Sequence, residues 1–208
     1  MADDQVMMET QAGGPGEFAR FDLTRVPSPC FVIDEAAIEN NLVVLKDIAD
    51  LSGAKILSAL KAFSLPAVGP LIGQYLSGTC ASGLHEARLG QEFYPGEVHV
   101  FSAAYSQSDL EELLTFADHI VFNSCSQWQR FQPQIQQAKQ LRPEMQFGLR
   151  INPEHSEGEH EIYDPCATGS RLGITRSLLD EYLLKDDFKN AFGLISGLHF
   201  HTLCEQDF

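Results

Sequence analysis

The stretch ISGLHFH, residues 195–201, decides between the two folds that the rest of the sequence allows. In an extended strand alternate side chains share one face, so Gly197, His199 and His201 lie together. Two other strand candidates show the same grouping, namely Lys55, Leu57, Ala59 and Lys61 in KILSALK and Gly148 with Arg150 in QFGLRI. An open sheet covered by helices on both faces would bury these polar groups without reason, whereas the strand ends of a (β/α)8 barrel converge on one mouth. The sequence therefore predicts a TIM-type barrel.

Short apolar runs alternate with helical patterns along most of the chain. Strands are predicted at PCFVID (29–34), KILSALK (55–61), GTCAS (78–82), EVHVFSA (97–103), HIVFNS (119–124), QFGLRI (146–151) and ISGLHFH (195–201). Helices are predicted from Asp34 or Glu35 to Asp50, closed by Gly53, and at 84–93, 108–117 and 126–139. Regular strand–helix steps of this kind are typical of parallel sheets, and no glycine-rich nucleotide fingerprint favours the open sheet.

The barrel is predicted to be incomplete. A (β/α)8 barrel takes about 250 residues, whereas this chain has 208 and offers six barrel strands. Residues 1–20 are polar and contain Gly13, Gly14, Pro15 and Gly16, so we expect a disordered N-terminal tail. Residues 21–208 then form the N-terminal part of the barrel domain, and we interpret the chain as a fragment that stops before the barrel closes.

Composition excludes several classes of protein. With 14 Lys+Arg against 29 Asp+Glu the formal charge is −15, which argues against nucleic acid as a partner. No apolar run approaches the length of a bilayer span, and the first residues do not resemble a secretory signal, so neither a membrane nor export is expected. Five scattered cysteines without CxxC pairing are typical of reduced thiols in the cytoplasm.

Four residues at the ends of three predicted strands are candidates for chemistry. Lys61 would point into a partly desolvated cavity, which disfavours its ammonium form and frees the amine to attack a carbonyl; a solvated surface lysine is the alternative. Arg150 is costly to bury unless it pairs with an anion or with a ring-facing acceptor, and a structural ion pair inside the barrel is the alternative. His199 and His201 share a face: His201 could stack on a flat ring or ligate a metal, and His199 is interpreted as a hydrogen-bonded core histidine. We predict no metal site, because one short histidine cluster is a weak ligand set.

A long loop follows the strand at 146–151. Residues 152–175 exceed the usual length of a connection, which suggests a functional segment. The loop contains the acidic residues Glu154, Glu157, Glu159, Glu161 and Asp164, followed by GSRLGIT with Arg171.

Several longer segments carry a family resemblance. SPCFVIDE, ILSALKAF, CASGLHEARLG, EVHVFSAAY, ADHIVFNSCSQW, GLRINPEHSE, YDPCATGSRLGIT and GLHFHTLCEQ recur in order between about residues 27 and 206. Together they resemble the carboxynorspermidine (carboxyspermidine) decarboxylases, alanine-racemase-like (fold type III) enzymes that use pyridoxal 5′-phosphate. GLHFHTLCEQ and FNSCSQW are the most specific segments.

The resemblance implies roles for individual residues. Lys61 looks like the lysine that carries pyridoxal phosphate covalently, and His201 like the histidine that stacks on its ring. Arg150 and Arg171 match arginines that contact the cofactor. Thr79 and His85 stand where ornithine and diaminopimelate decarboxylases have acidic residues, which fits the carboxynorspermidine branch.

The implied activity is the decarboxylation of carboxynorspermidine or carboxyspermidine to norspermidine or spermidine in polyamine biosynthesis, by a cytoplasmic homodimer. The family's phosphate loop, its acidic partner of the pyridine nitrogen, its trans-acting cysteine and its β-domain would follow Phe208, so we expect the isolated chain to be nearly inactive. Two alternatives remain: a non-catalytic pyridoxal-phosphate protein of cofactor homeostasis, and a barrel metallohydrolase with His199 and His201 as ligands.

Overall fold

A computed structural model describes residue 18 and residues 21–156 and 164–202. The strands are β1 (Leu57–Ala59), β2 (Gly78–Ala81), β3 (Glu97–Phe101), β4 (His119–Phe122), β5 (Gln146–Arg150) and β6 (Ile195–His199). The α-helices are α1 (Glu35–Ser52), α2 (Gly69–Ile72), α3 (Leu84–Phe93), α4 (Gln107–Phe116), α5 (Cys125–Arg130), α6 (Gln132–Leu141), α7 (Arg176–Leu183) and α8 (Asp186–Phe192). Short 3-10 turns span Leu23–Arg25 and Pro66–Val68. The predicted tail, residues 1–20, lies almost wholly outside the described part.

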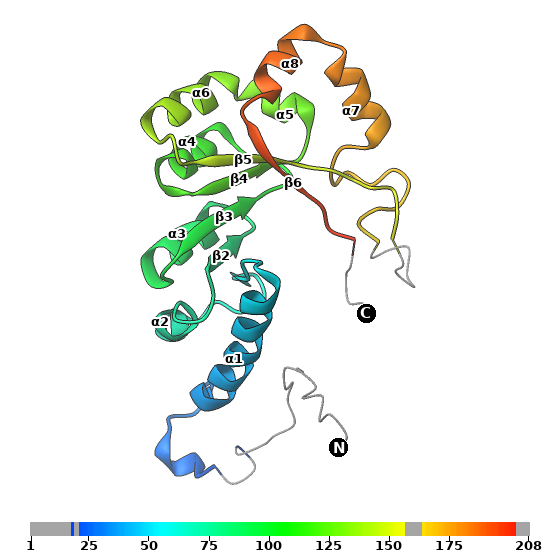
Figure 1. Ribbon diagram of the computed structural model, residues 1–208. Helices are drawn as coiled ribbons and strands as arrows, with labels where there is room; N and C mark the ends of the chain where they lie inside the picture. The colour runs from blue at the N-terminus through cyan, green and yellow to red at the C-terminus, as the bar shows by residue number, and fades with distance from the viewer. Residues whose placement is uncertain (1–17, 19–20, 157–163, 203–208) are drawn as a thin grey trace.

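The strands form one parallel sheet in the order β1-β2-β3-β4-β5-β6. A doubly wound sheet reverses its strand order at a switch point, whereas a barrel adds each new strand beside the last. Figure 1 shows α3, α4 and α6 together along one side of the strands. The predicted barrel topology is therefore confirmed, as an arc of six strands whose first and last members each have one neighbour within the described residues.

The two faces of the sheet differ in chemistry. Outward side chains of β3, β4 and β5 are apolar and buried against the helices: Val98, Val100, Ile120, Phe122, Phe147 and Leu149. The alternate, inward positions carry Glu97, His99, Phe101, His119, Val121, Gln146, Gly148 and Arg150. The sheet is thus anchored by its outer face, which leaves the inner face for polar groups.

Three of the helices that follow strands have a serine or threonine as their N-cap residue. Ser106 caps α4, Ser124 caps α5 and Thr175 caps α7, each accepting a hydrogen bond from a backbone N–H of the first turn. These bonds satisfy donors that a helix leaves unpaired at its start. α1 begins in the same way at Asp34 and ends at Gly53, whose φ of 72° is the left-handed conformation that glycine adopts most easily.

Two local predictions were wrong. Residues 29–34 are not a strand: the segment pairs with no described strand, Phe31 is fully exposed, and Asp34 caps α1 instead. The single helix predicted at 126–139 is divided into α5 and α6 at Phe131. Pro133 explains the division, because proline has no backbone N–H and its ring clashes with the carbonyl of residue i−4. No helix in the described part of the chain is both long and apolar enough to cross a bilayer.

The core depends on one aromatic cluster between the sheet and its helices. Phe122 is completely buried and packs edge-on against Trp128, with ring centroids 5.3 Å apart, and against Tyr105 at 5.7 Å. We expect Phe122→Ala to lower the free energy of unfolding by about 3–5 kcal/mol, because truncation leaves a cavity in a close-packed interior. Urea denaturation followed by circular dichroism measures the change.

Phe31→Ala is the matched control, since that ring is fully exposed. We expect the control to change stability by no more than about 0.5 kcal/mol. Equal denaturation midpoints for the two variants would contradict this assignment of the core.

Candidate active site

A cavity of about 860 Å³ lies at the carboxyl ends of the strands. Its wall is built from residues at or just after the ends of β1, β2, β3, β5 and β6, together with residues 164–165 and 167–172 of the loop between β5 and α7. This volume lies in the range of small-molecule sites, roughly 300–1,000 Å³. The long loop that the sequence singled out therefore forms one wall of the cavity, although its residues 157–163 lie outside the described part.

The cavity brings together side chains from both edges of the sheet. Lys61 follows β1 and His201 follows β6, and both line the cavity. Burial lowers the pKa of His201, and the charges of Arg150 and Lys61 lower it further. The sheet therefore curves enough that residues following its first and last strands line the same cavity.

Lys61 differs from the prediction in its burial. It lies in a turn, because β1 ends at Ala59, and its side chain is exposed rather than desolvated. Leu60, between Ala59 and Lys61, is buried in a separate hydrophobic cluster that includes Leu42 of α1 and Ile72 of α2. Leu60 therefore anchors the turn from which Lys61 reaches the cavity.

Arg150 and His199 both contact the ring of Phe101. The Arg150 guanidinium carbon lies 4.6 Å from the centroid of the Phe101 ring, and the His199 ring stacks on Phe101 at 5.0 Å. Arg150 is 5% exposed, and burial lowers its pKa. It forms no ion pair with a described carboxylate, so the structural ion pair considered above is absent there, and a cation–π contact stands in its place.

His199 is not the hydrogen-bonded core histidine that the sequence suggested. Its Nδ1 is buried and has no hydrogen-bond partner among the described residues, and the same is true of Arg150 Nε. Burial lowers the pKa of His199 to about 4, with further contributions from Arg150 and His201. Two buried polar groups beside the cavity thus have unused hydrogen-bonding capacity, which a bound polar molecule would satisfy.

The loop wall is fixed by Asn123, which directly follows β4. Its side-chain amide donates to the carbonyl of Arg171 at 2.9 Å and accepts from the N–H of Gly173 at 2.9 Å. Gly173 has φ +86°, and a Cβ there would lie 2.8 Å from the backbone of Asn152, so only glycine fits comfortably. Arg171 is exposed and lines the cavity at the end of this fixed segment.

Cys166 links the loop to the end of β6. Its thiol donates to the carbonyl of His201 at 3.4 Å, and its backbone N–H donates to Asp164 at 2.7 Å. Burial raises the pKa of the Cys166 thiol, which keeps it protonated and able to donate. Cys166 therefore holds the backbone of the loop beside the end of β6.

The four predicted site residues Lys61, Arg150, Arg171 and His201 all line this one cavity. The sequence analysis missed Phe101 and Asn123. Strand alternation could have indicated Phe101, because it shares a face with Glu97 and His99. Asn123 could have been noticed as a polar residue directly after a buried strand. Thr79 and His85 do not line the cavity. Thr79 is buried against Gly90 of α3, and His85 is exposed on the same helix.

The charged groups of the cavity suit an anionic ligand. Lys61, Arg150 and Arg171 contribute positive charges and Asp164 a negative one, in a chain whose formal charge is −15. A cofactor with a carbonyl, a flat ring and anionic oxygens would find an amine, two imidazoles and two guanidinium groups there. The residues present therefore fit pyridoxal phosphate.

No family model matches the sequence, but three curated proteins are similar to most of the chain. The chain is 36% identical, over 88% of its length, to a carboxynorspermidine/carboxyspermidine decarboxylase of Campylobacter jejuni. It is also 36% identical over 89% of its length to a carboxyaminopropylagmatine decarboxylase of Synechocystis. A Herminiimonas arsenicoxydans carboxynorspermidine/carboxyspermidine decarboxylase is 38% identical over 86% of the chain. The chain spans about 44% of the length of the first two of these relatives and 45% of the third.

Solved structures of decarboxylases also resemble this chain. Crystalline carboxynorspermidine decarboxylase from Campylobacter jejuni, complexed with norspermidine, matches 87% of the chain and 42% of its own length with a TM-score of 0.70 at 32% identity. Diaminopimelate decarboxylase from Helicobacter pylori, complexed with L-lysine, shares the fold with a TM-score of 0.62 at 18% identity. The chain is thus similar in sequence and in fold to a little under half of the carboxynorspermidine/carboxyspermidine decarboxylases.

Proposed function

We propose that this chain carries part of the active site of a pyridoxal-phosphate-dependent decarboxylase that converts carboxynorspermidine or carboxyspermidine to norspermidine or spermidine in polyamine biosynthesis. The observation that carries the proposal is the convergence of Lys61 and His201, from opposite edges of the sheet, on one cavity that also receives two arginines. The sequence likeness to decarboxylases of that name adds the substrate class.

Lys61 is proposed as the residue that binds the cofactor covalently. Its primary amine can attack the cofactor's carbonyl carbon, and its exposed position gives a substrate amine access to the same carbon. Once displaced, the Nζ atom of Lys61 is free to hold a proton for the α-carbon of the substrate. When bound, pyridoxal phosphate supplies the electron sink for the carbon–carbon bond that breaks as CO₂ leaves.

His201, Arg150 and Arg171 are proposed to orient the cofactor. The imidazole of His201 can lie against one face of a flat ring, and its lowered pKa keeps it neutral for that contact. The guanidinium groups of Arg150 and Arg171 can bind anionic oxygens. Phe101 contacts both Arg150 and His199, so loss of this ring would disturb both.

The names of the relatives suggest the substrate class. Each relative acts on a carboxylated polyamine or agmatine derivative, which combines an amino acid end with a cationic chain. The cavity offers cationic groups for the carboxylate, and Asp164 on the loop wall could contact the cationic chain.

We further propose a cytoplasmic homodimer, on the basis of the family resemblance. All four described cysteines, Cys30, Cys80, Cys125 and Cys166, are free thiols, which suits a reducing compartment.

The covalent role of Lys61 leads to a direct prediction. When the chain is incubated with pyridoxal phosphate and reduced with borohydride, peptide mass spectrometry should find the pyridoxyl label on Lys61. Lys61→Ala should remove the label, whereas Lys189→Ala, an exposed lysine on α8, should leave it unchanged.

Competition extends this test to the substrate. Carboxynorspermidine should suppress labelling of Lys61 at lower concentrations than ornithine does, because it carries the longer cationic chain. A label on Lys61 that no polyamine suppresses would favour a cofactor-homeostasis protein, and the absence of any label at Lys61 would contradict the proposed enzyme.

The low pKa of His199 has a consequence for stability. The folded chain binds the proton of His199 only near pH 4, while the unfolded chain binds it near the ordinary value of 6.5. Between these values the unfolded state holds more protons, so the contribution of His199 to stability is present above pH 6.5 and is lost as the pH falls towards 4.

Denaturation midpoints measured from pH 7.5 to 4 should therefore fall, and His199→Gln should show a smaller fall over the same range. An identical pH dependence in the variant and the parent chain would show that His199 is not buried in its neutral form.

A further inference from the structure

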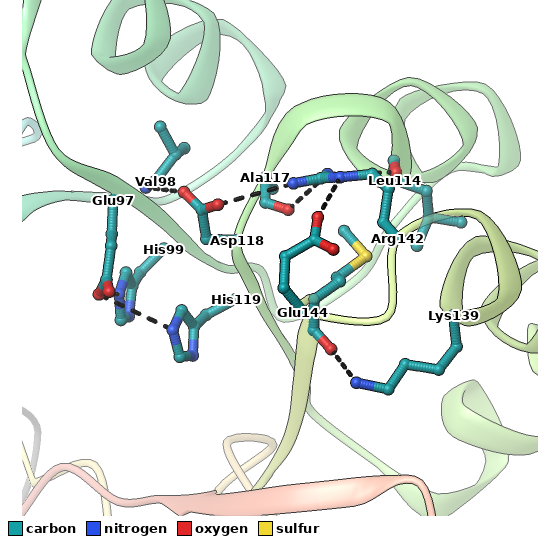
Figure 2. A network of polar contacts seen from close by, with 11 residues as sticks. Glu97, Val98, His99, Leu114, Ala117, Asp118, His119, Lys139, Arg142 and Glu144 are labelled. Atoms are coloured by element: carbon teal, nitrogen blue, oxygen red, sulfur yellow. Dashed lines mark hydrogen bonds and ion pairs between the residues drawn. The ribbon is translucent and has the colours of Figure 1, made fainter.

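A second cluster of reactive side chains lies on the inner face of the sheet, outside the cavity. Glu97 and His99 are two residues apart on β3 and share a face, and His119 on β4 is the register partner of His99. Figure 2 shows Glu97 and the two imidazoles turned towards one another. None of the three lines the cavity described above, although Phe101, two residues further along the same face of β3, does.

The donor atoms of the cluster lie close together. His99 Nε2 is 2.9 Å and His119 Nε2 is 3.8 Å from Glu97 Oε2. One donor atom from each residue falls within 4.8 Å of the others. In a tetrahedral zinc site, bonds of about 2.0–2.1 Å put neighbouring ligand atoms roughly 3.3 Å apart, which lies between the two measured distances.

The cluster is the only group of three metal-capable side chains in residues 18, 21–156 and 164–202. His199 and His201, which the sequence raised as ligands of a metallohydrolase, belong to no such group in these ranges. The donors are two imidazoles and one carboxylate, a set that zinc uses when a fourth position stays open for water.

Surrounding contacts hold the cluster in place. Lys55 pairs with the other oxygen of Glu97, so Oε2 remains for the imidazoles. Asp118, next to His119, accepts a hydrogen bond at 2.8 Å from the N–H of Val98, which lies between Glu97 and His99. Arg142 lies 3.6 Å from Asp118 and donates to the carbonyl of Ala117 at 2.8 Å (Figure 2). The two strands that carry the donors are therefore tied together by side chains as well as by the sheet.

We propose that Glu97, His99 and His119 form a site for a single divalent zinc-like cation on the inner face of β3 and β4. The two imidazole rings are stacked, with centroids 3.9 Å apart and planes at 14°. Binding turns the rings about their Cβ–Cγ bonds until their lone pairs converge on the ion, while the strands stay in register. The ion replaces the proton of the hydrogen bond between His99 and Glu97, and it joins β3 to β4 beneath the cavity.

The test is a metal titration of the untagged 208-residue chain after treatment with a chelator. Co²⁺ serves as the spectroscopic probe, because four-coordinate Co²⁺ has intense visible bands, and Zn²⁺ is then added to displace it. We expect saturation at one ion per chain. Glu97→Gln and His119→Gln should each weaken binding by at least about tenfold, and circular dichroism should show that both variants fold.

Matched histidine variants separate this site from other binding. His85→Gln, on the exposed surface of α3, and His199→Gln, in the cavity, should leave the affinity unchanged. The proposal is overturned if the parent chain shows no saturable binding, if binding survives in both Glu97→Gln and His119→Gln, or if it is lost in His199→Gln. Because the titration of the parent chain alone can overturn the proposal, it remains testable even if a variant fails to fold.

Discussion

The parallel pairing of consecutive strands is the constraint on which the rest of the structure depends. Each strand from β1 to β6 lies beside its predecessor, and helices α3, α4, α5, α6 and α8 pack on the outer face of the sheet. Helices can pack on that face only because Val98, Ile120, Phe122 and Phe147 supply a continuous apolar surface. A twisted sheet covered on one side curves away from its cover. The curvature explains why side chains that follow β1 and β6 reach one cavity.

The inner face that results has two levels with different chemistry. Near the carboxyl ends of the strands, the cavity contains an amine, two guanidinium groups and imidazoles whose pKa values are lowered, chiefly by burial. Two residues before Phe101 on β3, and at the first residue of β4, the imidazoles of His99 and His119 face a carboxylate instead. The cavity thus suits an anionic ligand, and the cluster of Glu97, His99 and His119 suits a cation. Phe101 on β3 lies between the two. Neither level takes part in the aromatic packing that stabilises the fold.

Local rules predicted most of the secondary structure. Asp34 and Gly53 bound α1 as expected, and residues 84–93 form α3 as predicted, because capping and helical periodicity act within a few residues. Alternation in QFGLRI and ISGLHFH also placed Arg150 and His201 at the cavity, since a strand has only two faces. The segment 29–34 shows the limit of such rules: its apolar residues fit a strand, but a strand forms only beside a partner.

Tertiary contacts account for what the sequence did not predict in the site. The exposure of Lys61 depends on the turn after β1 and on Leu60, and the missing partner of His199 depends on how Phe101 lies against it. Asn123 acts on residues 171 and 173, almost fifty positions away along the chain, and no local pattern indicates that contact. Such contacts exist only once the strands are paired.

The claim that the sheet curves until its two edges share one cavity is tested most directly by the electrostatic coupling of Lys61 to His201. The pKa of His201 can be followed by NMR from the imidazole proton between the ring nitrogens, with His201→Gln used to assign its signal. Burial, Arg150 and Lys61 all lower this pKa, so Lys61→Gln should raise it, while Lys189→Gln should leave it unchanged. An unchanged pKa of His201 in Lys61→Gln would mean that the ends of β1 and β6 lie apart, and it would contradict the account of the site.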